Sequence, residues 1–138
     1  MNKLFKQPLF IEVLSLTIVV AIIHWIASIY YFYYLVPNLD ILMHFLGGLL
    51  IGLIILSLLF VRRLFGFAHT HHGVVITTTL FGVLLIGLGW ELFEVFFDMT
   101  AITRIDLFDT LLDLVMDLIG GGVSLWWYYS MVWNRVVK

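Results

Sequence analysis

The sequence predicts an all-α membrane protein, a four-transmembrane-helix bundle with both termini in the cytoplasm. Three observations predict it: the hydropathy of the whole chain, four long apolar runs, and a one-sided distribution of lysine and arginine. The 138 residues are 63% hydrophobic and only 12% charged, whereas soluble domains are usually about a quarter charged. A mean hydropathy of +1.12 indicates that lipid is the main solvent of the chain.

Composition also excludes several classes of function. Cysteine is absent, so the chain has no disulfide framework, thiolate metal site or cysteine nucleophile. The net charge is −2 and no stretch is densely basic, which argues against nucleic acid as a partner. The length allows one domain, residues 1–138, and membrane lipids are the partners that this composition implies.

Four apolar runs are long enough to cross a bilayer as helices, which takes about 18 or more residues. They cover about residues 9–36, 39–61, 74–99 and 107–133. Pro8 suits a first helical turn, and Pro37 with Asn38 ends the first run. Residues 66–73 and 100–106 form the other turns. The first run is too long for a signal peptide and no small-residue cleavage site follows it, so we expect it to be retained.

The basic residues give the orientation, because cytoplasmic flanks carry lysine and arginine in excess. With four spans, six of the seven basic residues lie on one side of the membrane, and only Arg104 lies on the other. The six are Lys3, Lys6, Arg62, Arg63, Arg135 and Lys138. This distribution predicts a multi-pass protein of the cell membrane whose N- and C-termini are both cytoplasmic.

The acidic residues are just as one-sided. Of the nine, only Glu12 lies near the inner face in this topology, and eight lie in the outer half or the outer loops. The eight are Asp40, Glu91, Glu94, Asp98, Asp106, Asp109, Asp113 and Asp117. Their spacings of three, four and seven residues place each set on one helix face, and His44 lies four residues after Asp40. We therefore expect three helices to direct carboxylates and one imidazole into a shared outer pocket.

An ionised carboxylate near the bilayer centre costs about 2.5–3.5 kcal/mol on insertion scales, so the deep members of this set are unusual. They are Glu91, Glu94, Asp113 and Asp117. The nearby basic groups, Arg104, His44 and His24, are too few to neutralise them. The cluster must be protonated, hydrated or bound to cations, and we favour a metal or proton site that includes His44.

Ligand types narrow the choice of metal. Many carboxylates with one imidazole and no sulfur suit Mg²⁺, Mn²⁺, Ca²⁺ or Fe²⁺, with Zn²⁺ as an alternative. The candidate ligands are Asp40, His44, Glu91, Glu94, Asp98, Asp109, Asp113 and Asp117. Di-metal carboxylate bundles carry Glu-x-x-His twice, and the single histidine here weakens a di-iron interpretation.

Other polar residues have simpler interpretations. Asp106 and Asp109 are explained equally well as caps of the fourth helix, whose positive end favours acids. His24 is expected to be a hydrogen-bonded histidine of helix packing. A polar interfacial turn is favoured over a peripheral metal site for His69, His71 and His72.

Glycines lie on the same faces as the acids. Gly47, Gly87 and Gly120 each lie close to an acid or to His44 along the chain, and Gly48-x-x-x-Gly52 is a motif of close helix approach. We expect these faces to pack tightly below the pocket. The same faces offer a route to a homo-oligomer.

Three sequence blocks carry a family resemblance. They are Asp40-x-x-x-His44-Phe45-x-Gly47-Gly48, Gly89-Trp90-Glu91-x-x-Glu94 and Asp109-Thr110-x-x-Asp113-x-x-x-Asp117-x-x-Gly120. In this order and spacing they resemble the YjdF-like family of small prokaryotic integral inner-membrane proteins of unassigned function. The resemblance covers spans two to four and implies that these polar residues form the family's shared site. It implies no substrate.

Three hypotheses of function follow. The first is a metal-dependent hydrolase or transferase acting on lipid-linked or phosphate-containing substrates, because carboxylate-held divalent ions polarise phosphoryl oxygens and activate water. Glu91 or Glu94 would then be the general base. The second is an ion or proton transporter, but no carboxylate continues a path through the inner half and no internal repeat is evident. The third is an accessory subunit of a membrane complex.

Overall fold

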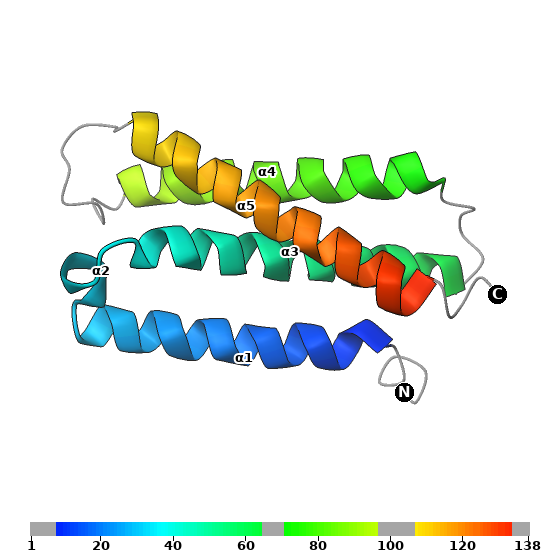
Figure 1. The fold of residues 1–138 in the computed structure, drawn as a ribbon, viewed down its shortest axis with the longest axis horizontal. Coiled ribbons are helices and arrows are strands. Elements are labelled where there is room, and N and C mark those ends of the chain that lie inside the picture. Colours follow the sequence, from blue (N-terminus) through cyan, green and yellow to red (C-terminus); the bar gives the residue numbers. More distant parts are fainter. Residues whose placement is uncertain (1–7, 65–70, 97–106, 134–138) are drawn as a thin grey trace.

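The computed structural model describes residues 8–64, 71–96 and 107–133. The elements in these ranges are all helical: α1 (Pro8–Ile29), α2 (Phe32–Leu35), α3 (Leu39–Leu64), α4 (His72–Phe96) and α5 (Leu107–Trp127), which continues as the π-helix η1 (Tyr128–Trp133). Figure 1 shows α1, α3, α4 and α5 running along one another, with the short α2 where α1 turns into α3. The all-helical fold class is confirmed.

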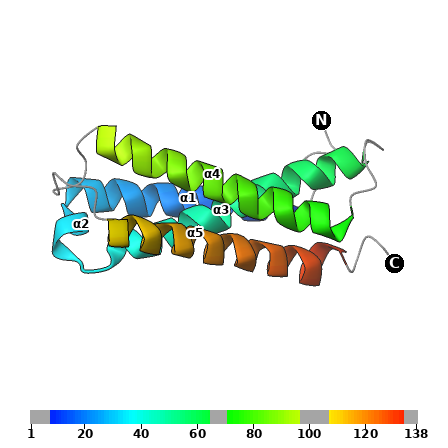
Figure 2. The same cartoon turned by 90° about the horizontal axis from the view of Figure 1, so that it is seen from above.

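Successive long helices run in opposite directions. The end of α1, the starts of α3 and α5 and the end of α4 therefore lie together, at the end of the bundle that carries α2 (Figures 1 and 2). We call this the α2 end. The start of α1, the end of α3, the start of α4 and η1 lie at the opposite end. Residues from three different helices can thus meet at the α2 end, although they are distant in sequence.

Helix α3 is central, because it packs against α1, α4 and α5, most extensively against α5. Glycines permit this close approach. A Cβ atom on Gly48 would overlap the backbone of Asp117, and one on Gly120 would overlap the backbone of Phe45. A Cβ atom on Gly52 would overlap the side chain of Ser124. The prediction that the Gly48/Gly52 motif packs helices closely is confirmed.

The opposite end of the bundle holds the apolar core. Its buried residues come from α1, α3, α4, α5 and η1, and they are Leu9, Leu53, Leu56, Phe60, Val75, Leu125 and Tyr128. The described part of the bundle is therefore polar inside at the α2 end and apolar inside at the opposite end.

Three of the described helices are long and apolar enough to cross a membrane, over Leu9–Ile29, Leu39–Phe60 and His72–Phe96. Helix α5 carries three aspartates and is not among them. Large apolar side chains are exposed on the outer faces of the bundle, including Trp25, Phe81 and Trp126. Such faces suit contact with lipid rather than water.

The prediction of one helix through residue 36 was wrong. Helix α1 ends at Ile29, and Tyr31 has a left-handed backbone with φ of 57°. Residues 30–34 are all aromatic, and aromatic side chains lose rotamer freedom in a helix, so the run breaks easily here. The predicted helix start at Pro8 and the turn at Asn38, whose φ is 62°, are confirmed.

Candidate metal centre

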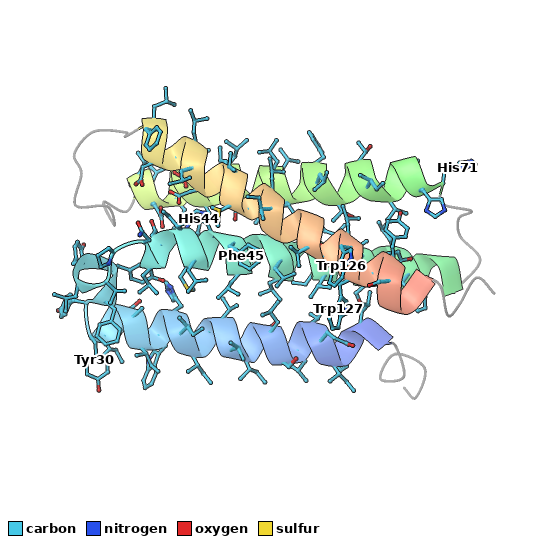
Figure 3. All side chains as sticks on the ribbon, viewed as in Figure 1. Tyr30, His44, Phe45, His71, Trp126 and Trp127 are labelled. Carbon is cyan, nitrogen blue, oxygen red and sulfur yellow. The ribbon has the colours of Figure 1, made fainter. Side chains whose placement is uncertain are left out.

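The polar cluster lies at the α2 end and is built from three helices. Asp40 and His44 come from the first two turns of α3, Glu91 and Glu94 from the end of α4, and Asp113 and Asp117 from the first half of α5. Figure 3 labels His44 on α3, near the α2 end. The antiparallel order of the helices brings these residues together, as the sequence predicts.

His44 lies between carboxylates of two other helices. Its side chain is buried, with 5% of the residue exposed. Nδ1 lies 3.3 Å from Oδ2 of Asp117, within hydrogen-bond distance. Nε2 lies 3.7 Å from Oε1 of Glu91, which is too long for a hydrogen bond. The two ring nitrogens therefore have different environments.

Several buried polar atoms of the cluster lack a partner. Nε2 of His44, Oε1 of Glu91 and Oδ1 of Asp113 are buried and have no hydrogen-bond partner among the described residues. Among all the described residues, one further buried atom lacks a partner, Oε2 of Glu12 on α1, outside the cluster. An unsatisfied buried polar atom costs about 1–3 kcal/mol, so three of them in one cluster call for a physical explanation.

The geometry of the cluster suits an ion. Ligand atoms from Asp40, His44 and Asp113 all lie within 4.8 Å of one another, and so do ligand atoms from His44, Glu91 and Glu94. Divalent ions bind oxygen at about 2.0–2.6 Å, so two ligands of one ion are at most ~5 Å apart. Both sets of three residues meet this requirement, and they share His44.

Two further residues hold the glutamates in place. The hydroxyl of Thr110 donates a hydrogen bond of 2.9 Å to Oε2 of Glu91. The indole Nε1 of Trp90 donates one of 2.7 Å to Oε1 of Glu94. Neither residue was among the candidate ligands predicted from sequence, although both lie in the blocks that carry the family resemblance. The four-residue spacing of Trp90 and Glu94 on one helix was the signal that could have found the second contact.

The absence of a side chain at Gly87 of α4 leaves room for the carboxylate of Asp117. A Cβ atom on Gly87 would overlap Oδ2 of Asp117, the oxygen that faces Nδ1 of His44. Asp117 itself is buried, with 5% of its surface exposed. The glycine predicted to share a face with Glu91 thus borders the carboxylate of another helix.

A second polar pair lies beside the cluster. Nδ1 of His24 and the hydroxyl of Tyr33 are 2.7 Å apart, and the His24 ring meets the Trp90 ring edge-on at 6.4 Å. Burial, and then the nearby charges of Asp40 and Glu94, raise the pKa of Tyr33 to about 12. The phenol therefore stays protonated and shares a hydrogen bond with His24. The prediction of a hydrogen-bonded packing histidine is confirmed.

The remaining candidates are placed differently. Asp109 lies in the first turn of α5 and is exposed, and it belongs to neither set of three among the described residues. Asp98, Arg104, Asp106 and His69 lie outside the described residues. His71 and His72 lie at the opposite end, where the ring of His72 packs on Tyr129 at 5.2 Å. For Asp109, the alternative prediction remains, in which its carboxylate stabilises the positive N-terminal end of α5.

Fold and cluster together define a helical membrane protein with a buried histidine–carboxylate cluster at one end. The family model described as "Predicted membrane protein (DUF2238)" matches residues 1–134, and the chain belongs to this family. No curated protein and no solved structure matches the chain significantly. The resemblance to a membrane family of unassigned function is confirmed.

Proposed function

We propose that this protein is a four-span membrane protein that binds a divalent cation at the α2 end. The site would face the outer side of the membrane. The observation that carries the proposal is the group of three buried atoms without partners: Nε2 of His44, Oε1 of Glu91 and Oδ1 of Asp113. A cation held by either set of three residues would give His44 a partner, together with Glu91 in one set or Asp113 in the other. It would also offset the repulsion between carboxylates that come from three helices.

The candidate ligands form two sets that share His44: Asp40, His44 and Asp113 in one, and His44, Glu91 and Glu94 in the other. Asp109, in the first turn of α5, and Asp98, outside the described residues, are further candidates. The donor set, carboxylates with one imidazole, favours Mg²⁺, Mn²⁺, Ca²⁺ or Fe²⁺ and also admits Zn²⁺.

Four spans and an outward site are supported by geometry and charge. Helix α5 has 21 residues, which corresponds to about 30 Å of helix, the thickness of a bilayer core. The start of α1 and η1 lie at the same end of the bundle. Four spans with N- and C-termini in the cytoplasm of a prokaryotic cell place the α2 end outside.

The chemistry of such a site favours a metal-dependent enzyme. A bound divalent ion polarises phosphoryl oxygens and lowers the pKa of bound water. Glu91 or Glu94, where it does not bind the ion, is placed to accept a proton from that water as general base. A site at the membrane surface suits lipid-linked or phosphate-containing substrates.

A transporter finds less support. A transport path needs polar groups through the opposite half, where the apolar core lies. Two buried hydroxyls of the described residues are satisfied by their own helices: Thr79 donates to the carbonyl of Val75 at 2.8 Å, and Ser124 to that of Gly121 at 2.6 Å. An accessory subunit, whose acids meet a partner's cations, is the remaining alternative. Among the described glycines, Gly73, Gly89 and Gly122 are open for association between copies, since a Cβ atom on these would meet no described atom within 4 Å.

The test is metal binding by the purified protein. We expect about one equivalent of a divalent metal to remain bound after purification, and thermal stability to fall on chelation and recover when the metal is added back. His44→Ala should abolish this response. His71→Ala is the matched control, because His71 is exposed at the opposite end. Metal content below about a tenth of an equivalent, with no response to added ions, would refute the proposal.

Enzyme and transporter are separated by a second measurement on the metal-loaded protein. Release of inorganic phosphate from lipid-linked phosphates in detergent, lost in Glu91→Gln, supports the enzyme. Uptake of the metal into proteoliposomes without such release supports transport. Metal binding with neither activity leaves the accessory subunit.

A further inference from the structure

Asp117 differs from the other acids of the cluster. It faces Nδ1 of His44, whereas the partnerless Oε1 of Glu91 faces Nε2. It is also absent from both sets of three residues that could hold an ion among the described residues. Metal-binding histidines usually donate their other ring N–H to a carboxylate or carbonyl, which fixes the tautomer and the ring orientation. The Asp117 carboxylate lies where it can accept this second N–H, from Nδ1 of His44.

We propose that Asp117 is a positioning residue, which accepts the Nδ1–H of His44 and thereby keeps the Nε2 lone pair available for one metal ion. This inference rests on the proposed function for its metal, but its hydrogen bond exists without one. It adds a role for Gly87: this glycine is the place on α4 that admits the Asp117 carboxylate.

The packing supports a fixed Asp117. The backbone of Asp117 lies against Gly48, and a Cβ atom on Gly48 would overlap the carbonyl group of Asp117. Its Oδ1 atom lies 3.9 Å from the Cβ position of Gly47, which is ordinary contact. Oδ2 fills the space beside Gly87. Three glycines on two helices thus surround one aspartate and fix its carboxylate beside the imidazole.

The arrangement also limits the number of ions. Both sets of three residues share His44. With Nδ1 held by Asp117, only Nε2 remains as a ligand, and one nitrogen lone pair binds one ion. The imidazole therefore serves a single ion, and a second ion would have carboxylate ligands alone. This agrees with the weakness of a two-metal interpretation from sequence.

The first experiment needs no metal. Nitrogen-15 NMR of histidine-labelled, metal-free protein, at a pH where the imidazole is neutral, distinguishes the two tautomers of His44, with the signal assigned from its loss in His44→Ala. We expect the Nδ1–H tautomer in the wild type. In Asp117→Leu, which has similar size and no acceptor, Glu91 is the nearer remaining carboxylate and the Nε2–H tautomer should dominate. A wild-type Nε2–H tautomer overturns the proposal.

The second experiment uses two glycines of one helix. Gly87→Ala should displace Oδ2 of Asp117 and lower the affinity for Mn²⁺ by about 10–100-fold, the usual effect of losing such a partner. Gly89→Ala should leave the affinity unchanged, because no described atom lies within 4 Å of its Cβ position. Equal affinities in the two variants overturn the role of Gly87. If Gly87→Ala does not fold, Asp117→Leu, which removes the acceptor at similar size, should show the same loss.

The two proposals fail separately. If the wild type binds no metal but His44 is the Nδ1–H tautomer, the metal site is wrong and the positioning role stands. If metal binds and His44 is the Nε2–H tautomer, the positioning role is wrong and the metal site stands.

Discussion

The hydroxyl of Thr110 donates a 2.9 Å hydrogen bond to Oε2 of Glu91, which joins the first turn of α5 to the end of α4. The other oxygen of the same carboxylate, Oε1, lies 3.7 Å from Nε2 of His44. Because one oxygen is held, the other is directed toward the imidazole. Through its two oxygens, the Glu91 carboxylate therefore contacts both of the other helices that carry the cluster.

Thr110→Val should remove this hydrogen bond at nearly constant volume. We expect the Mn²⁺ affinity, measured by isothermal titration calorimetry, to fall by about 10-fold or more, as for other residues that orient a metal ligand. Thr110→Ser keeps the hydroxyl and should retain most of the affinity. An unchanged affinity in Thr110→Val would mean that Glu91 needs no help to face the ion.

Two glycines should respond in opposite directions to alanine. Gly48→Ala forces a methyl group into the backbone of Asp117, which cannot swing away, and should destabilise the bundle by about 1–3 kcal/mol. Gly122→Ala meets no described atom and should gain up to about 1 kcal/mol from better helix propensity. Thermal unfolding in one detergent measures both. Equal stabilities would contradict the close approach of α3 and α5.

The orientation can be tested with single cysteines, because the chain has none. Pro37 is exposed at the α2 end, and His71 is exposed at the opposite end. In intact cells a membrane-impermeant maleimide should label Pro37→Cys and should label His71→Cys only after lysis. The reverse pattern would place the cluster on the cytoplasmic side.

Tyr33→Phe should break the hydrogen bond that ties α2 to α1. The pKa of Tyr33, raised to about 12 by burial and by Asp40 and Glu94, keeps its hydroxyl protonated at neutral pH, where it shares a hydrogen bond with His24. We expect a loss of about 0.5–1.5 kcal/mol of stability. Tyr34→Phe, at an exposed neighbour, is the control and should change little. Equal unfolding temperatures for Tyr33→Phe and Tyr34→Phe would contradict this prediction.

Much of the fold follows from sequence because a membrane imposes simple rules. A lipid-exposed backbone must satisfy its own hydrogen bonds, so long apolar runs become helices, and their bounds are set by residues such as Pro8 and Asn38. Helical periodicity also places Glu91 with Glu94, and Asp113 with Asp117, before any contact is known. The break at Tyr31 could not be read in this way, because the hydropathy of the run continues across it.

Packing decided what periodicity could not. From sequence, Asp113 and Asp117 are equivalent, four residues apart on one face of α5. In the structure Asp113 has an oxygen without a partner among the described groups, whereas Asp117 meets Nδ1 of His44. The difference arises because glycines of α3 and α4, Gly48 and Gly87, both adjoin Asp117 and leave room for its carboxylate beside the imidazole.

The sequence by itself determined a helical membrane protein whose acids and single deep imidazole gather at one end, since hydropathy, charge and helical period are properties of residue order alone. Only the tertiary structure decided which nitrogen of His44 faces which carboxylate, and that Thr110 and Trp90 hold the glutamates. Those contacts depend on the rotation and depth of each helix, which are set by side-chain packing between segments far apart in the chain.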